Sequence, residues 1–204
     1  MRRQLVPAVI SMVVFTLLFG VAFPLVITGI GQVAFHHQAE GSIVEQHGTK
    51  IGSSLIGQAF TDVKGAPLSQ YFQSRPSAAL GAAGDTVAGY DPTESSGSNL
   101  GPSNPELLKL VDQRVKAYRK LNGLADDTLV PVDAVTASAS GLDPDISVAN
   151  ARLQAGRVAR ERGMPVAKVR ALIDDHTQGR TLGIVGEQTV DVLALNRALD
   201  RAAR

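Results

Sequence analysis

A short run of small residues, Ser-Ala-Ser-Gly at 138–141, is the first candidate for chemistry in this sequence. Small residues that precede a helix can leave backbone N–H groups open to an anion such as phosphate. The next residues, Asp143-Pro144-Asp145, are expected to begin that helix. Two carboxylates there would already satisfy the helix dipole and would repel phosphate. A loop that caps the helix is therefore the default interpretation, and an anion site is the alternative.

The motifs of the common hydrolytic and ATP-hydrolysing sites are absent from the sequence. It contains no G-x-x-x-x-G-K-[ST] loop, no H-E-x-x-H, no G-x-S-x-G and no S-x-x-K. It also lacks D-K-T-G-T, the sequence that carries the phosphorylated aspartate of P-type pumps. The chain therefore cannot itself be the phosphorylated subunit of such a pump.

Metal-ligating residues are few and scattered. The chain has no Cys, which excludes zinc fingers, iron–sulfur clusters, thiol redox sites and disulfide scaffolds. The four His stand at positions 36, 37, 47 and 176. The adjacent pair at 36–37 could touch a metal, but interfacial residues at a membrane surface are the default interpretation. The sequence therefore predicts no metal site.

The segment T-V-A-G-Y-D at 86–91 looks at first like the T-V-G-Y-G-D filter of potassium channels. An Ala separates Val from Gly, and the second Gly is missing. A filter also needs four such loops held around a pore. A surface turn is the better interpretation.

Charge is nearly balanced along the chain. The 204 residues include 20 Lys and Arg against 19 Asp and Glu, and 44% of the residues are hydrophobic. A nucleic-acid-binding protein usually carries a clear basic excess, so no nucleic-acid partner is expected. The hydrophobic share also argues against a wholly disordered chain.

The apolar residues are concentrated near the N-terminus. From Gln4 to Phe35 there is no charged residue and no His, so residues 8–30 predict one transmembrane helix. Arg2 and Arg3 precede it, which predicts a cytoplasmic N-terminus at residues 1–7 and an extracytoplasmic remainder. A cleaved signal peptide is the alternative, but its apolar region would be about 7–15 residues long. Pro24 is expected to kink the helix.

The remainder predicts a connector at 31–50 and one α+β domain at 51–204. Helical spacing and cap residues predict helices over 105–122, from Asp143 to about Arg162, from Pro165 onwards and over 190–203. Short β-rich runs predict strands at 54–60, 129–136 and 181–185. The arginines at 152, 157, 160 and 162 are expected on a solvated helix face.

The segment 65–105 is rich in Gly, Ser, Pro, Ala and Asn and predicts a long irregular loop. Such a loop inside a compact domain is usually functional or disordered. Because it offers few residues that could bury themselves, we expect it to contact a partner. The expected contact residues are Tyr71, Phe72, Arg75, Pro76, Asn99, Gly101, Pro102, Asn104 and Pro105.

Several long strings make the chain similar to the C subunit of the Kdp potassium-transporting ATPase. They are YFQSRPSA at 71–78, SGSNLGPSNPEL at 96–107, VPVDAVTASASGLDPDIS at 130–147 and HTQGRTLGIVGEQTVDVLALNRAL at 176–199. The match covers nearly the whole chain and also includes the N-terminal span. Chance agreement over strings this long and unusual is excluded.

The resemblance implies an inner-membrane complex that takes up potassium by hydrolysing ATP, with ATP and Mg bound at the level of the complex. Its other members would be a channel-like A subunit, a P-type B subunit and a small F subunit. The C subunit would be needed for assembly and would act as a catalytic chaperone that raises the ATP affinity of the B subunit. Its suspected nucleotide contact is the loop of Ser138, Ser140 and Gly141. The predicted orientation puts this loop outside, where ATP is scarce, so the effect would be indirect unless the orientation is reversed.

Two other functions remain open on the residues alone. A membrane-anchored periplasmic hydrolase would need a nucleophile–base pair, for which His176 is the only His deep in the domain. A solute-binding module would need a ligand motif, and none is present. An accessory pump subunit is the favoured function.

Overall fold

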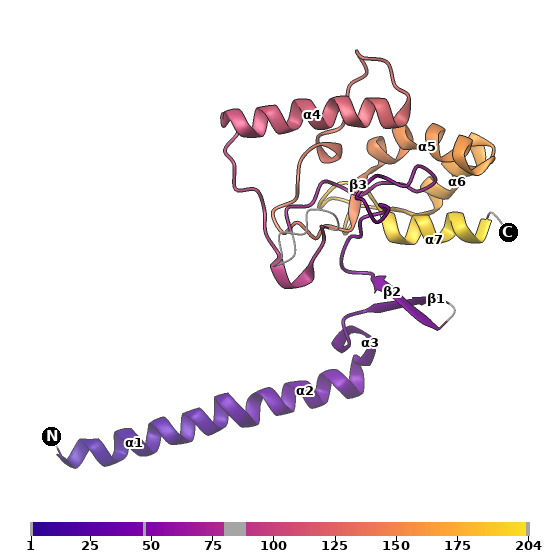
Figure 1. Cartoon of the computed structure of the whole chain (residues 1–204). Coiled ribbons are helices and arrows are strands. Elements are labelled where there is room, and N and C mark those ends of the chain that lie inside the picture. Colours follow the sequence, from indigo (N-terminus) through magenta and orange to yellow (C-terminus); the bar gives the residue numbers. More distant parts are fainter. Residues whose placement is uncertain (1, 47, 80–88, 203–204) are drawn as a thin grey trace. The chain divides into compact units, whose positions relative to one another are not determined.

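The computed structural model describes residues 2–46, 48–79 and 89–202. The chain forms two compact units, Met1–Ser53 and Ser54–Arg204, and each is described by itself (Figure 1). The first unit is one long apolar helix followed by a small hairpin. The second holds four α-helices and one small sheet among its described residues.

The long helix is continuous but changes its winding once. α1 (Arg2–Leu17) and α2 (Phe23–Ala34) are joined by a π-helical turn at Leu18–Ala22, in which Phe23 N–H bonds to Leu18 O. Pro24 comes directly after this turn. A proline ring clashes with the carbonyl four residues earlier, and a wider turn relieves that clash. The kink expected at Pro24 thus takes the form of a π turn.

This helix is the one candidate for a membrane span among the described residues. Over Arg3–Ala34 its 32 residues have a mean hydropathy of 2.5, and none of its most apolar stretch is buried. A helix of about 20 apolar residues suffices to cross the hydrocarbon layer. The helix therefore continues beyond the predicted span of 8–30 by several residues at each end, while the bounds of the span itself stay a prediction.

The rest of the first unit is compact. α3 (His36–Ala39) leads into the antiparallel hairpin of β1 (Ile43–Gln46) and β2 (Thr49–Ser53). Gln32 bridges the helix end, since its side chain lies 3.0 Å from His36 Nδ1 and donates to Glu40 at 3.1 Å. Within the described ranges no group of three or more His, Asp or Glu could hold a metal ion.

Two predicted helices of the second unit are confirmed at their starts. α4 (Pro105–Asn122) begins at the cap Asn104, whose side chain accepts a hydrogen bond from Glu106 N at 2.8 Å, and it ends at Gly123 as predicted. α6 (Val166–Asp175) follows Pro165. Cap residues and proline thus marked both starts correctly.

The predicted start of the next helix was wrong. α5 (Val148–Arg162) ends as predicted, but its cap is Ser147, and the residues before it form the strand β3 (Asp145–Ser147). β3 pairs with β5 (Thr189–Asp191), and β5 pairs with β4 (Thr177–Gln178), all antiparallel. α7 (Val192–Ala202) therefore starts two residues later than predicted; position 203 lies outside the described residues.

The three other predicted strands were also wrong. The structure has irregular chain at 54–60, a 3-10 turn (Val132–Ala134) within 129–136, and a turn closed by one bridge at 181–185. β-rich composition without a neighbouring strand cannot form a sheet, because the backbone groups need a partner. Of the surface turn predicted at 86–91, positions 86–88 lie outside the described residues.

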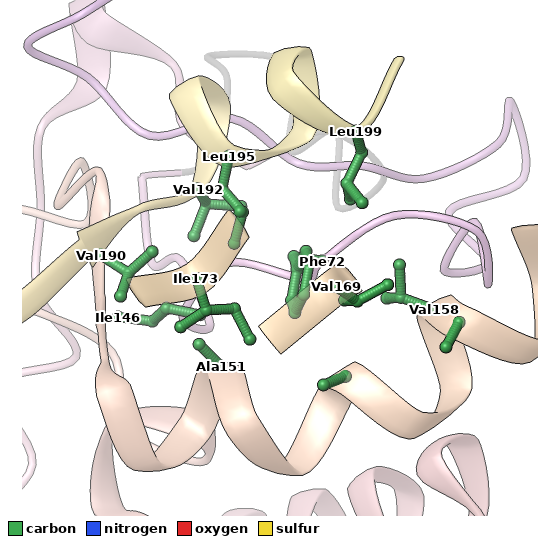
Figure 2. Close-up of a cluster of buried hydrophobic side chains, with 12 residues drawn as sticks. Phe72, Ile146, Ala151, Val158, Val169, Ile173, Val190, Val192, Leu195 and Leu199 are labelled. Carbon is green, nitrogen blue, oxygen red and sulfur yellow. The ribbon is translucent and has the colours of Figure 1, made fainter. Parts of the chain in front are cut away.

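The hydrophobic core of the second unit lies between α5, α6, α7 and the small sheet (Figure 2). Aliphatic residues dominate it, and Phe72 is the one aromatic side chain among its described buried residues. Phe72 comes from the irregular segment, not from a helix or strand. The core is therefore completed by part of the chain that composition marked as a loop.

Candidate functional site

Buried amide side chains hold the segment around Phe72 in place. Asn196 on α7 accepts from Phe72 N at 2.9 Å and donates to Phe72 O at 3.0 Å. Gln154 on α5 does the same for Gln73, with distances of 2.7 and 3.0 Å. Each side-chain amide thus bonds to the backbone as a neighbouring strand would. We call these two residues, with Asn150 and Arg157, the polar clamp.

Arg157 lies at the centre of the polar clamp and is 1% exposed. It donates to Asn122 Oδ1 at 2.9 Å, to Tyr71 O at 2.8 Å, to Gln154 Oε1 at 2.8 Å and to Ser69 O. Each of these acceptors is an uncharged oxygen. Burial lowers the pKa of Arg157 to about 10. The predicted solvated face of arginines was therefore wrong at this position.

Asn150 extends the polar clamp towards α4. Its Oδ1 accepts from Tyr118 OH at 2.8 Å and from Gln154 at 2.9 Å, and its amide nitrogen donates to Asp133 at 2.9 Å. Asp133 also binds the N–H and the hydroxyl of Ser147, the cap of α5. One connected network therefore ties α4, α5 and the 3-10 turn together.

Of the predicted partner-contact residues at 71–76, Phe72 is buried, while Tyr71, Arg75 and Pro76 are half-buried. Phe72 is 0% exposed, so its side chain packs in the core and presents no surface to a partner. The Tyr71 ring lies 4.7 Å under the Arg162 guanidinium. Arg75 pairs with Asp143 at 2.8 Å, and its carbonyl accepts from Tyr90 OH at 2.7 Å. Residues 71–76 thus pack against the rest of the domain, whereas their composition predicts a loop with few residues that could be buried.

The other predicted contact residues lie at or before the start of α4. Asn99, Gly101, Pro102 and Pro105 are exposed, while Asn104 is half-buried as the helix cap. Nothing in the described structure joins this group to residues 71–76 in one surface. Contact between either group and a partner stays a prediction.

The loop at 138–141 is a packing junction. Ser140 O accepts from Ser96 N at 2.9 Å and from Ser95 Oγ at 3.0 Å, while Gly141 O accepts from Ser77 Oγ at 2.7 Å. Gly141 has φ +69°, and a Cβ there would lie 2.5 Å from Ser96 O. Three chain segments therefore meet at this glycine more closely than a larger residue permits.

The geometry removes one argument for an anion site in this loop. The helix expected directly after it does not exist, because Asp143 precedes strand β3. The N–H groups of Gly141 and Leu142 bond to Ser138 O and Ser140 Oγ within the loop. A nucleotide contact through Ser138, Ser140 and Gly141 stays a prediction that rests on the family resemblance.

A cavity of about 620 Å³ lies between α4 and the segment 67–76. Its lining is mostly apolar, with Arg114 at the edge donating to Val135 O at 3.0 Å. Burial lowers the pKa of Arg114. Pro76, a predicted contact residue, contributes to this lining.

The hydrolase alternative finds no support at His176. Its Nδ1 lies 2.9 Å from Leu172 O, one turn earlier in the chain, so the ring is held against α6. Across the described ranges, no serine hydroxyl is seen in hydrogen-bonding contact with this ring. A nucleophile–base pair is the arrangement that such an enzyme requires.

Sequence reasoning missed the polar clamp, although a signal for it was present. Gln154 and Arg157 fall on the same face of α5 as Ala151 and Val158, which are both buried. Asn196 likewise stands beside Leu195 on the apolar face of α7. A polar residue within an apolar stripe is expected to have hydrogen-bond partners. Here the backbone partners in the segment 69–73 lie 81–124 positions away.

Among the described residues, an apolar helix long enough to cross a membrane is followed by an α+β domain, which defines the class: an α+β protein with one candidate membrane span. The family model described as KdpC, K+-transporting ATPase, c chain, matches residues 5–201. The chain therefore belongs to the KdpC family.

Curated relatives cover nearly the full chain. The potassium-transporting ATPase KdpC subunit of Mycobacterium tuberculosis (strain H37Rv) is 55% identical over 201 residues, which are 98% of this chain and 100% of the relative. The KdpC subunits of Caulobacter vibrioides (strain CB 15) and Beijerinckia indica are 50% and 49% identical, over 98% of this chain and 94% of each relative.

Proposed function

We propose that this chain is the accessory, single-span subunit of an ATP-driven potassium uptake complex in the cell inner membrane. The observation that carries the proposal is the match to the KdpC family over residues 5–201. Family membership makes the chain a subunit of a K+-transporting ATPase. The apolar helix over Arg3–Ala34 supplies the membrane association.

The chemistry of the pump belongs to other subunits in this proposal. The chain has no D-K-T-G-T sequence to be phosphorylated and no potassium filter sequence. ATP and Mg would bind the P-type B subunit, and potassium would pass the channel-like A subunit, with the small F subunit beside them. The role of this chain is to help assemble and stabilise that complex.

Purification of the full chain tests this role. A tagged chain is isolated in mild detergent from potassium-starved cells, and the proteins that come with it are identified by mass spectrometry. Recovery of a P-type ATPase subunit and a channel-like subunit in fixed ratio is the expected result. A chain that elutes without either of them would contradict the proposal.

We propose further that the N-terminus is cytoplasmic and that the domain is extracytoplasmic. Arg2 and Arg3 are the charges that favour this orientation. The absence of Cys permits a direct test with two single variants, Ser98→Cys in the exposed part of the domain and Gln4→Cys before the span. An impermeant thiol reagent should label Ser98→Cys on intact spheroplasts and Gln4→Cys only after lysis; the reverse pattern would refute the orientation.

In this orientation the chain affects ATP use through contacts between subunits. The isolated full chain should then take no label from 8-azido-ATP, and the complex without the chain should show a raised KM for ATP. Specific labelling of the isolated chain at 138–141, reduced by Ser140→Ala, would instead establish the direct nucleotide contact that the resemblance implies.

A further inference from the structure

Three large aliphatic side chains are exposed together on one turn of the domain. Leu182 is 89% exposed, Ile184 is 79% and Val185 is 58%. They lie within residues 180–187, which we call the apolar turn. An isolated exposed aliphatic residue is common, but a cluster of them usually marks an interaction site.

The apolar turn is ordered by its own backbone. Thr181 N donates to Val185 O at 2.9 Å, and Val185 N donates to Thr181 O at 3.0 Å. Gly183 N donates to Arg180 O at 3.0 Å inside the same turn. The exposure of the three side chains therefore does not come from an unstructured loop.

Leu182 has a second unfavourable feature besides its exposure. Its φ is +54°, in the left-handed region that residues with a Cβ rarely adopt. Backbone strain and an exposed apolar side chain thus fall on the same residue. Strain of this kind persists where the surrounding structure imposes it, and it clusters at binding and switch sites.

A polar hollow lies beside the apolar turn. It has a volume of about 750 Å³ and is lined by parts of the turn and the start of α5, namely Ser147, Val148, Ala149, Gly179, Arg180, Gly183, Glu187 and Gln188. The surface therefore offers an apolar projection next to a hollow with one cationic, one anionic and one amide side chain. Protein interfaces have this composition, an apolar centre with a polar rim.

We propose that the apolar turn and the hollow form the docking surface for another protein subunit of the same pump, a partner with an apolar pocket bordered by hydrogen-bonding groups. The proposal rests on the proposed function, which requires such a partner. A bilayer fits this surface less well, because residues 180–187 include Glu187 and no aromatic side chain. The proposed docking surface lies in a different part of the domain from the partner contact predicted at residues 65–105.

A substitution that relieves the strain separates docking from folding. Asn tolerates the left-handed region, so Leu182→Asn should leave thermal stability unchanged or raise it. The double variant Leu182→Asn/Ile184→Asn should nevertheless recover at least tenfold less of the pump subunits in the purification described above. Val63→Asn is the matched control, since Val63 is 93% exposed and lies outside the turn. Undiminished recovery with the double variant would overturn the docking proposal.

Photo-crosslinking identifies the occupant of the surface. A benzoylphenylalanine at position 182 of the full chain should crosslink to a pump subunit identified by mass spectrometry, and one at position 63 should not. Crosslinks from position 182 only to lipid, or only to a second copy of this chain, would refute the proposal. Both experiments presuppose that the wild-type chain recovers the pump; if it does not, the proposed function fails first.

Discussion

Asn196 and Phe72, 124 positions apart, are joined by a reciprocal pair of hydrogen bonds between a side-chain amide and a backbone peptide group. Both residues are buried, at 1% and 0% exposure. The pair lets an irregular segment enter the core without leaving its peptide groups unsatisfied. Since Phe72 fills the centre of that core, the hydrogen bonds and the packing of this segment depend on each other.

Asn196→Ala should therefore destabilise the domain strongly. The substitution leaves the buried N–H and C=O of Phe72 without partners, which costs about 2–4 kcal/mol in the free energy of unfolding. Urea unfolding of the full chain in detergent, followed by circular dichroism, measures this cost. Gln178→Ala, at an exposed position of β4, is the control and should change the free energy by less than about 0.5 kcal/mol. Equal effects of the two variants would contradict the role of Asn196.

Arg157→Met should also destabilise the domain, by about 3 kcal/mol or more. Methionine has similar length, but it leaves Asn122 Oδ1 and Ser69 O without their donor and takes one of two donors from Tyr71 O and from Gln154 Oε1. Arg160→Met, on the exposed side of the same helix, is the matched control. Thermal unfolding compares the two variants. An Arg157→Met variant as stable as Arg160→Met would show that the hydrogen bonds of the polar clamp contribute little.

The domain should lose stability in alkaline solution, because the Tyr90 hydroxyl is harder to ionise in the folded state than in the unfolded chain. Burial raises the pKa of its hydroxyl to about 12 from the ordinary value of 10.0. Between these values the unfolded chain releases the Tyr90 proton while the native state retains it. The unfolded state is then favoured as pH rises, by up to about 1.4 kcal/mol per pH unit.

The variant Tyr90→Phe isolates this effect. At pH 8 it should be less stable than wild type by about 1 kcal/mol, because it lacks the hydrogen bond to Arg75 O. Between pH 10 and 11.5 this deficit should shrink, since only the wild type loses stability through Tyr90. Urea unfolding of both proteins at pH 8 and at pH 11.5 measures this change in the deficit. A deficit that stays constant or grows would contradict the raised pKa of Tyr90.

Gly141→Ala tests whether the 138–141 loop is a packing junction. A Cβ at this position would lie 2.5 Å from Ser96 O and 2.7 Å from Ala79 N, so backbone must shift. Gly163→Ala is the matched control: φ is also positive, at +62°, but no atom lies within 4 Å of the added Cβ. Gly163→Ala should lower the free energy of unfolding by about 1 kcal/mol from conformation alone, and Gly141→Ala should lower it by clearly more. Equal losses in unfolding experiments would remove the packing argument.

The sequence predicts those elements whose signals are local. Asn104 and Pro105 mark the start of α4, and the uncharged run from Gln4 to Phe35 marks the long helix. Strands of two or three residues, such as β3 and β4, are too short to show an alternating pattern, and their partners lie far along the chain. This is why the sequence wrongly predicts a helix start at Asp143-Pro144.

The polar clamp escaped prediction for the same physical reason. The acceptors of Arg157 in the segment 69–71 are 86–88 positions away, and only the tertiary fold brings them to the side chain. Composition likewise marked the segment 65–105 as unable to bury itself, whereas side-chain amides from α5 and α7 satisfy the part around Phe72. The exposed apolar turn was a strand candidate, because the sequence alone does not show that no neighbouring strand covers it.

The most direct test of the account is the potassium-stimulated ATPase activity of the purified pump with and without this chain. The complex assembled from all subunits should hydrolyse ATP in a potassium-dependent manner, and omission of the chain should prevent assembly or strongly reduce that activity at limiting ATP. Addition of the full wild-type chain during assembly should restore it. A complex that assembles and hydrolyses ATP with the same potassium dependence in the absence of the chain would contradict its role as a required accessory subunit.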